Sequence, residues 1–596
     1  MNNYGIDIWG DDNFIIENGL VKINHSTKPS LISIVKDIRD KGNKGPLTLR
    51  FPHLATKQIN KLYSAFNQSI KEYDYSGNFN AVFPLKVNQL PNFIHPMLNN
   101  IKSLNYGLEA GSKAELFIAM AYNNNNAPIT VNGFKDKDMI TLGFIAKQQG
   151  HDITLTLEGI NELETIIEVQ KELNLPPPNI GLRVRLHSGG SGTWAKSGGM
   201  NSKFGLSATE ILEAYDILKD KNLLEYFTML HFHIGSSMNH IAPLKKALKE
   251  SGHIYAQLRK MGAINLKSIN IGGGLAIEYS QFKNTKEYSL EEFSNDVVFT
   301  LQTIAKNKDV LAPDIFIESG RFIAAPNSVL IAPVLELFSS EYEESSLKLK
   351  DNNPDIITEL YALYKEVNIK SAREFMHDAL EHLESILTLF DLGYVDLQDR
   401  SNAEILTNLI IKNAIELLEV NDYIELKKYE DRIQEKYLLN FSIFQSLPDF
   451  WGIDQEFPIM PITHLDKIAT RSATLWDITC DSDGEIPFDS NKPLYLHNVD
   501  LSKEEYFIGF FMTGAYQDIL GMRHNLFVNP HEVNVNFDEN GYKLDNFIKS
   551  QKILDILDDL EFDTIEFQTK LFDKIDNKNL QKLLENYLED NSYLKT

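Results

Sequence analysis

The chain has 596 residues and a mass of 67.9 kDa, more than one hydrophobic core usually supports, so two or three domains are expected. A formal net charge of -25 argues against nucleic-acid binding, which needs clustered cations, and a single cysteine excludes an intrachain disulfide and fits a reducing compartment. The N-terminus lacks the pattern of a signal peptide, and no run approaches the roughly 18 apolar residues of a membrane span. We therefore expect a cytoplasmic protein with no membrane or nucleic-acid partner.

Residues 78–335 alternate between short β-branched or apolar runs and stretches with helical periodicity. The runs that predict strands are NAVFPLKV, SLNYGLE, APITVNG, DITLTLE, NIGLRVRL, TMLHFHI, KSINIGG and DIFIES. This alternation indicates repeated βα units around a parallel sheet. Eight strands over roughly 240 residues is the size of a (β/α)8 barrel, whose chemistry sits at the C-terminal ends of the strands.

The rest of the chain has a different pattern of apolar and charged residues. Residues 340–438 form long charged amphipathic helices, which indicate an inserted helical bundle. Strand-like runs return over 439–545, and these are FSIFQSLP, FPIMPI, LWDITC, PLYLHNV, YFIGFFMTGAY and HEVNVNF. We expect a β domain there that closes on the barrel, with 1–77 contributing to it and 546–596 forming a helical extension. The predicted fold class is therefore α/β.

Polar residues stand at the ends of the predicted barrel strands. They are Lys86, Glu109, Arg183 or Arg185, His233, Gly272, Gly273, Gly274, Glu318 and Arg321. Each is a type that a site for an anionic, electrophilic cofactor would use. A lysine at the end of apolar AVFPLKV is either paired or kept as an amine that can form a Schiff base, unless it simply extends into solvent.

The other strand ends also allow two interpretations. The glycine triplet in IGGGLAIEY leaves backbone N–H groups free for a phosphate, although glycine clusters also make ordinary turns. His231 and His233 could be metal ligands, an imidazole lying over a cofactor ring, or satisfied core residues. Arg321 suits a phosphate, and Glu318 could keep a pyridine nitrogen protonated. The alternative for these last two is a local ion pair.

The chain also contains the blocks FPLKVNQ, GLEAGSKAEL, GSGTWAKSGGMNSKFGL, LHFHIGS, IGGGLAIEY, ESGR, FSIFQSLPDFWGIDQEFPIMPI, TCDSDG and GAYQDILGMRHNLF. Together these blocks resemble those of the biosynthetic arginine decarboxylases, which are large pyridoxal-phosphate enzymes of the alanine racemase and ornithine decarboxylase fold group. The resemblance runs from IDIWGDDNF near the N-terminus to HNLF and covers nearly the whole chain. It implies a barrel, a C-terminal β domain and a helical insert.

The resemblance also implies roles for individual residues. Lys86 would carry the cofactor as a Schiff base, His233 would stack on its ring and Glu318 would pair with its ring nitrogen. The remaining cofactor-binding residues would be Arg183, Ser236, Gly272, Gly273, Gly274, Gly320, Arg321 and Tyr516. The implied substrate-binding residues are Ile271, Gly272, Gly273, Gly274, Leu275, Asp481 and Asp483.

The fold group completes its sites across a dimer interface. The resemblance therefore implies that Tyr516 and the loop CDSDG serve the barrel of a neighbouring subunit, in a homodimer or homotetramer. It also implies a magnesium requirement, for which no ligand spacing in the sequence gives a site.

Cys480, the only cysteine, stands in TCDSDG. Loss of carbon dioxide from a Schiff-base amino acid leaves a carbanion that must be protonated, and a thiol, which ordinarily titrates near pH ~8.5, is a competent acid. Asp481 and Asp483 would keep the thiol protonated and would suit a guanidinium. The alternatives are an inert buried cysteine and a solvated turn.

Some positions depart from the family pattern. Asn270 stands where we expect an aspartate, Ala276 and Glu278 replace a glycine and an aspartate, and Ser237 replaces a glutamine. We expect these changes to alter affinity more than reaction type. The predicted reaction is decarboxylation of L-arginine to agmatine, toward putrescine and spermidine. The alternatives are decarboxylation of ornithine, lysine or diaminopimelate, and a non-catalytic regulatory homologue.

Overall fold

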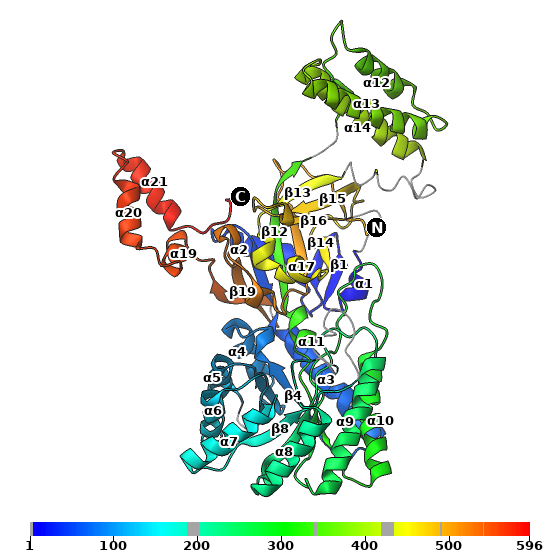
Figure 1. Ribbon diagram of the computed structural model, residues 1–596. Helices are drawn as coiled ribbons and strands as arrows, with labels where there is room; N and C mark the ends of the chain where they lie inside the picture. The colour runs from blue at the N-terminus through cyan, green and yellow to red at the C-terminus, as the bar shows by residue number, and fades with distance from the viewer. Residues whose placement is uncertain are drawn as a thin grey trace.

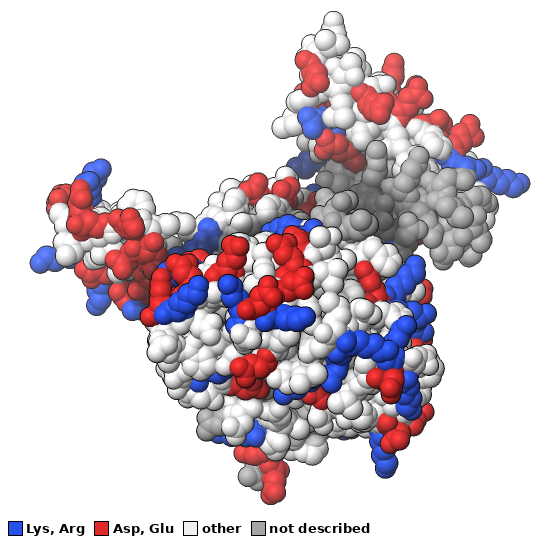
Figure 2. All heavy atoms as spheres, turned by 60° about the horizontal axis from the view of Figure 1, so that its bottom comes forward, with Lys and Arg blue, Asp and Glu red and all other residues white. Residues whose placement is uncertain are grey.

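The computed structural model describes residues 4–124, 126–187, 199, 202–338, 342–418, 429, 434–488, 492–539 and 541–595. Figure 1 shows a barrel at the bottom of the view, a second sheet above it, a helical bundle at the top and a helical C-terminal arm to the left. No helix among the described residues is both long and apolar enough to span a membrane. Acidic and basic side chains are interspersed on the barrel end that Figure 2 brings forward.

Eight parallel strands close into a barrel in the order β10-β11-β4-β5-β6-β7-β8-β9. They are β4 (Phe79–Pro84), β5 (Tyr106–Ala110), β6 (Ile129–Val131), β7 (Ile153–Leu157), β8 (Asn179–Arg183), β9 (Phe227–His231), β10 (Ser268–Asn270) and β11 (Asp314–Ile317). β5, β6 and β7 are buried at every position, as expected of strands covered on both faces. The predicted barrel and its strands are confirmed.

Helices between the strands cover the outside of the barrel (Figure 1). They are α4 (Pro91–Asn100), α5 (Lys113–Tyr122), α6 (Lys137–Gln148), α7 (Ile160–Leu173), α8 (Ala208–Asp220), α9 (Ala242–Met261) and α10 (Leu290–Lys308). Serine side chains begin several of them: Ser112, Ser207 and Ser289 each accept the N–H three residues further on. Gly262 caps the C-terminal end of α9, and its φ of 118° is easily adopted only by glycine.

The second sheet has ten strands and draws on both ends of the chain. They are β3 (Leu47–Arg50), β12 (Ser328–Phe338), β13 (Glu435–Leu439), β14 (Ile459–Pro461), β15 (Arg471–Trp476), β16 (Glu485–Ile486), β17 (Tyr495–Leu496), β18 (Phe507–Phe511), β19 (His531–Asp538) and β20 (Gly541–Ile548). β3 pairs antiparallel with β12 and parallel with β19, so the N-terminal segment contributes a central strand.

The N-terminal segment also forms smaller elements. They are α1 (Ile6–Trp9), β1 (Phe14–Glu17), β2 (Leu20–Ile23), α2 (Leu31–Arg39) and α3 (Pro52–Glu72). β1 and β2 pair as a separate two-stranded sheet. α3 packs against α10 and α4 of the barrel, although it lies within the range 1–77 that was expected to serve the β domain.

The run FSIFQSLP was predicted as a strand, and this prediction is wrong. It forms the short helix α16 (Ile443–Ser446) and the start of α17 (Pro448–Ile453). The Ser442 side chain accepts the Gln445 N–H and so begins α16, while Pro448 takes the first position of α17, where its missing N–H does no harm.

The predicted helical bundle consists of α12 (Asp355–Glu366), α13 (Ala372–Asp391) and α14 (Leu397–Leu418). Its buried side chains form two clusters separate from the main core. The sequence predicted that the bundle extends to residue 438, but β13 already begins at Glu435. The helical C-terminal extension is α19 (Ile553–Asp559), α20 (Thr564–Phe572) and α21 (Lys578–Leu588).

Arg50 joins the second sheet to the segment that covers the barrel. Its side chain is fully buried, and its Nη1 and Nη2 lie 2.9 Å from Asp518 Oδ2 and 2.8 Å from Glu532 Oε2. Nη1 also donates to Ser328 Oγ at 2.9 Å. Burial opposes the charge, but the two carboxylates raise the pKa of Arg50 above its ordinary value.

We predict that Arg50→Met lowers the free energy of unfolding by about 3–5 kcal/mol, because it leaves Asp518 and Glu532 without their buried counter-charge. Denaturant unfolding of the purified protein measures this change. Lys113→Met is the control: Lys113 pairs with Asp136 and Asp138 at the surface, so its loss should change stability little. Equal effects of the two substitutions would contradict the prediction.

Candidate active site

A cavity of about 360 Å³ lies at the C-terminal ends of the barrel strands, facing α17 and α18 (Gln517–Leu520). Most of the predicted site residues line it: Lys86, His233, Ser236, Gly273, Gly274, Leu275, Glu318, Gly320, Arg321 and Tyr516. The barrel rule therefore located the cavity correctly.

Lys86 reaches into this cavity from the turn η1 (Leu85–Val87), which follows β4. Its neighbours Leu85 and Val87 are buried, whereas the lysine side chain is accessible through the cavity. Enclosure would lower the pKa of Lys86, but the charges of Glu109, Tyr516 and Glu318 outweigh it and raise the pKa. The amine is therefore held as a cation while the cavity contains only these groups.

Two buried carboxyls, Glu109 on β5 and Glu318 after β11, stand near Lys86. Glu318 Oε1 accepts from Asn132 Nδ2 at 2.8 Å and from Asn270 Nδ2 at 3.3 Å. Burial, and then the charge of Glu318, raise the pKa of Glu109 to about 8. Of these groups, Glu109 can therefore exchange a proton near neutral pH.

His231 is the last residue of β9 and His233 follows it two residues later, and only His233 reaches the cavity. His233 lines the cavity, and its Nδ1 accepts the Gly235 N–H at 3.0 Å. His231 is buried, with its Nδ1 3.8 Å from Glu318 Oε1. Burial, followed by nearby positive charges that include Lys86 and Arg183, lowers the pKa of both rings well below 6.5. Both imidazoles are therefore neutral, and His233 presents its Nε2 side to the glycine loop.

The glycine triplet brings the backbone close to His233. At Gly272, where φ is 67°, an added Cβ would lie 2.6 Å from the Phe232 carbonyl oxygen, so only glycine fits. An added Cβ at Gly273 would lie 3.4 Å from His233 Nε2. Ile271 and Gly272 do not line the cavity, and the Ile271 N–H donates to the Phe316 carbonyl.

Arg321, on α11 (Gly320–Ala324), also lines the cavity. Its Nε donates to Ser236 Oγ at 3.3 Å, its Nη1 lies 3.5 Å from Asp449 Oδ2, and its guanidinium lies 4.6 Å from the centre of the Tyr516 ring. Asp449, at the start of α17, is a cavity residue that the sequence analysis missed. The signal available in the sequence was an acidic residue directly after a proline that can begin a helix, within the block FSIFQSLPDFWGIDQEFPIMPI.

Tyr516 lines the cavity of its own chain, so the prediction that it serves a neighbouring subunit is wrong. Its N–H donates to the Val87 carbonyl at 2.8 Å, directly beside Lys86. Asn88 Nδ2 donates to the Gly514 carbonyl at 3.0 Å. These bonds hold the segment GAY against the barrel of the same chain.

Arg183 lies beside the cavity but does not line it. Its Nη1 is 2.9 Å from Glu158 Oε1, and its guanidinium is 4.6 Å from the centre of the Phe204 ring. Arg185 donates to the Gly205 carbonyl. The block GSGTWAKSGGMNSKFGL contains Phe204, but residues 190–198, 200 and 201 fall outside the described residues.

Cys480, Asp481 and Asp483 are exposed on the loop after β15, and none of them lines the cavity. Asn525 Nδ2 lies 3.6 Å from Cys480 Sγ, and the His524 ring bonds Asp481. Asp483 Oδ2 accepts from Trp451 Nε1 at 3.4 Å. A single chain therefore does not bring these three predicted residues together with Lys86.

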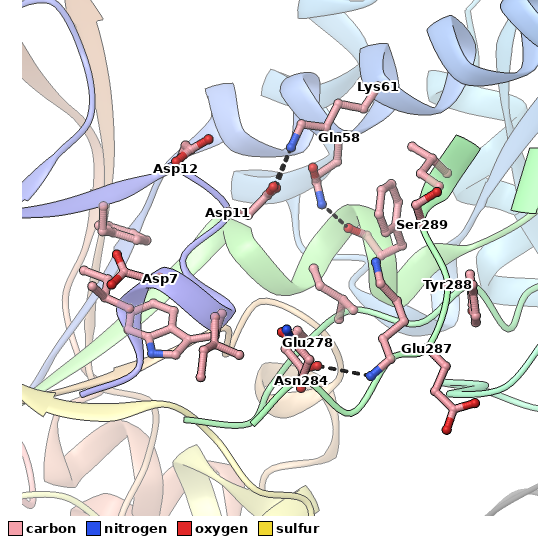
Figure 3. Close-up of a pocket in the computed structure, with 18 of the residues that line it drawn as sticks. Asp7, Asp11, Asp12, Gln58, Lys61, Glu278, Asn284, Glu287, Tyr288 and Ser289 are labelled. Carbon is pink, nitrogen blue, oxygen red and sulfur yellow. Dashed lines mark hydrogen bonds and ion pairs between the residues drawn. The ribbon is translucent and has the colours of Figure 1, made fainter. Parts of the chain in front are cut away.

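A second cleft, of about 980 Å³, lies between the N-terminal segment and residues 277–290. Figure 3 shows its charged lining, in which Asp11 pairs with Lys61. Glu278 accepts the N–H groups of Ser280 and Thr285 there, which explains this departure from the family pattern as a loop-building residue. None of the predicted cofactor- or substrate-binding residues lines this cleft.

A closed barrel, a second sheet beside its rim, and a cavity where a lysine, a carboxylate and an arginine meet define the class of pyridoxal-dependent decarboxylases. Residues 56–325 match the family model described as the pyridoxal binding domain of pyridoxal-dependent decarboxylases. Residues 350–428 match the arginine decarboxylase helical bundle domain. The chain belongs to the biosynthetic arginine decarboxylase family.

Individual relatives support this assignment. Biosynthetic arginine decarboxylases of Phocaeicola vulgatus and Citrifermentans bemidjiense are 37% and 36% identical, over 94% and 97% of this chain and 91% and 94% of theirs. The crystal structure of the biosynthetic arginine decarboxylase from Campylobacter jejuni is 57% identical, covers 100% of both chains and has a TM-score of 0.93. Diaminopimelate decarboxylase from M. jannaschi is 18% identical, with a TM-score of 0.63 over 92% of this chain and 98% of its own, which shows the fold alone.

We predict that Glu109→Gln flattens the pH dependence of unfolding of the cofactor-free protein. The pKa of Glu109 rises from 4.5 to about 8 on folding, so the folded state keeps a proton that the unfolded state releases. Wild-type stability therefore falls as pH rises through this window, and glutamine removes that contribution. Denaturant midpoints across the window measure the slope. Glu213→Gln, at an exposed position of α8, should keep the wild-type slope, and identical slopes for Glu109→Gln and wild type would contradict the prediction.

Proposed function

We propose that this protein uses pyridoxal 5'-phosphate to decarboxylate L-arginine to agmatine and carbon dioxide, a step toward putrescine and spermidine. The observation that supports this most is the meeting of Lys86, Glu318 and Arg321 in one cavity of a chain of this family. These residues offer an amine, an anion for a ring nitrogen and a cation for a phosphate.

The groups around the cavity fit this cofactor. Arg321 and the glycine-loop N–H groups would hold the phosphate, and neutral His233 would lie against the ring. Glu318 would face the ring nitrogen. Ser319 Oγ, buried beside the loop, has no hydrogen-bond partner within the described ranges, so a donor is left for a bound group.

Bound pyridoxal phosphate would supply an electron-withdrawing ring that stabilises negative charge on the α-carbon of an amino acid held through its amine. Lys86 must lose a proton before its amine can act as a nucleophile, and Glu109 and Glu318 are the carboxyls that face it. Glu109 exchanges a proton near neutral pH, which suits it to take this one.

Two groups of carboxylates could select arginine. Asp449 and Glu318 line the cavity, and a carboxylate can bind a guanidinium through paired N–H···O bonds. Asp449 is placed to do this from the same chain. Asp481 and Asp483 would do it from the exposed loop, as the sequence predicted.

The exposed loop would complete the site of a second copy. Cys480 would then supply the proton that replaces the lost carboxylate, and a homodimer would be the smallest active form. A homotetramer and a cytoplasmic location remain predictions from the sequence. Among the described residues, no group of three or more His, Cys, Asp or Glu side chains could bind a metal. The magnesium requirement stays a prediction from the family resemblance.

We predict that the purified protein is yellow from its cofactor and releases carbon dioxide and agmatine from arginine. Lys86→Ala should lose both the visible absorbance and the activity, because no other lysine lines the cavity among the described residues. Absorbance spectra and capture of carbon dioxide measure the two properties. The exposed lysine variant Lys102→Ala should keep both.

The same assay separates the alternatives. Faster release of carbon dioxide from ornithine, lysine or diaminopimelate than from arginine would show that the preferred substrate is that amino acid. A protein that stays colourless after incubation with pyridoxal phosphate would support a non-catalytic regulatory homologue.

We predict that Cys480→Ala slows agmatine formation by about 10²–10⁴-fold, the usual effect of losing a general acid, without loss of cofactor absorbance. Mixing Cys480→Ala with Lys86→Ala subunits should restore activity to at most about a quarter of wild type, because half of the dimers are mixed and each has one intact site. Activity of refolded mixtures measures this. Lys86→Ala mixed with the double variant should stay inactive, and no recovery in the first mixture would refute the shared site.

A further inference from the structure

Asn270, the last residue of β10, connects two parts of the cavity that would bind opposite ends of the cofactor. Its side chain is fully buried. Its Oδ1 accepts the Gly272 N–H at 2.9 Å, and its Nδ2 donates to Glu318 Oε1 at 3.3 Å. Since an amide has one accepting end and one donating end, only one orientation makes both bonds.

The glycine loop and Glu318 are also joined directly. The Glu318 N–H donates to the Gly272 carbonyl at 2.9 Å. Asn270 therefore closes a small ring of hydrogen bonds that contains the glycine-loop backbone and the Glu318 side chain and backbone. A shift of the loop moves the carboxylate with it.

Several titratable groups face Glu318 from neighbouring strands. They are Lys86 after β4, Glu109 on β5 and His231 on β9. Asn132, after β6, is its other amide donor. Because His231 is neutral, Lys86 is the positive group among these, and the amide donors supply the rest of the stabilisation of a buried carboxylate.

An aspartate at this position, which the family resemblance leads one to expect, would act differently. Its carboxylate could accept the Gly272 N–H, but when ionised it has no hydrogen to donate. It would also place another negative charge within hydrogen-bond distance of Glu318, in a region where Glu109 is already unfavourable to ionise. One of the carboxyls would then retain a proton.

We propose that Asn270 is a positioning residue whose amide holds the Glu318 carboxylate in register with the glycine loop, so that the ring nitrogen and the phosphate of the cofactor meet their partners together. This inference rests on the proposed binding of pyridoxal phosphate in this cavity. In this chain, the position of Glu318 would therefore depend on the neutral amide of Asn270.

The test is Asn270→Asp, which replaces the side-chain NH2 group by an oxygen of similar size and so removes the hydrogen-bond donor. Binding of pyridoxal phosphate to cofactor-free protein is titrated by absorbance over a range of pH. We expect an affinity at least about tenfold below wild type at the alkaline end, where a lost bond to a charged group is fully felt. The deficit should shrink as pH falls, because a proton on the carboxyl pair restores a donor. Affinity equal to wild type at every pH would overturn the proposal.

Asn402→Asp is the matched control. Asn402, in the helical bundle, is fully buried and also uses both ends of its amide, accepting the Lys348 N–H and donating to the Lys348 carbonyl, both at 3.0 Å. This variant should bind the cofactor as wild type does at every pH. A deficit with the same pH dependence as in Asn270→Asp would show a general effect of a buried carboxylate and overturn the proposal.

The double variant Asn270→Asp with Glu318→Gln guards against a folding defect. It places a donor and an acceptor opposite each other again and has the same number of carboxyls as wild type, so it should fold. Its affinity for the cofactor should stay below that of wild type, because the carboxylate that would face the ring nitrogen is gone. If Asn270→Asp alone does not fold, recovery of the fold in the double variant supports the proposal and failure of both overturns it. These experiments measure cofactor binding and folding, and none of them needs turnover. A protein that binds the cofactor but leaves arginine unchanged would therefore refute only the proposed reaction.

Discussion

The closed parallel barrel forces the C-terminal ends of all its strands onto one rim, and this protein encloses ionisable side chains at that rim. Enclosure favours the uncharged form of every group, so each must find an opposite charge or become neutral. Lys86 stays charged because Glu109 and Glu318 face it, whereas His233 is neutral. Arg321 has Asp449 nearby. The cavity is thus a balanced set of charges, and a cofactor that brings both a phosphate and a ring nitrogen fits it because each has a counter-charge waiting.

The second sheet is as necessary to this balance as the barrel. Arg50 holds Asp518 of α18 and Glu532 of β19 together in the core. Asn88, two residues after Lys86, bonds both the Gly514 carbonyl and Asp518. The wall that carries Tyr516 is therefore fixed from the sheet side and from the barrel side. A disturbance of the sheet core reaches the cavity through a few hydrogen bonds rather than through a flexible linker.

Much of this arrangement could be predicted from the sequence, because strand ends in a parallel barrel converge whatever the details of packing. Lys86, Glu318 and Arg321 followed from that rule alone. Asp449 did not, since its proximity to Arg321 depends on how α17 packs, more than 120 residues away along the chain. FSIFQSLP has the apolar content of a strand, and only the capping by Ser442 and the position of Pro448 decide for helix. The assignment of Tyr516 to a neighbouring subunit came from the family resemblance, whereas the bond of its N–H to the Val87 carbonyl holds it at the cavity of its own chain.

The loop with Cys480 is built around one buried carboxylate, that of Asp477. Asp477 shapes it by accepting the N–H groups of Ile443 at 2.8 Å and Thr479 at 2.9 Å, and an added Cβ at Gly484 would lie 2.1 Å from Asp477 Oδ1. A buried carboxylate thus holds a turn whose thiol and carboxylates are exposed. The loop's bonds to Ile443, Trp451 and Asn525 come from the same chain, and none of these three residues lines the cavity. On the proposed arrangement, the reaction needs the cavity of one chain and the loop of a second, so association would control catalysis.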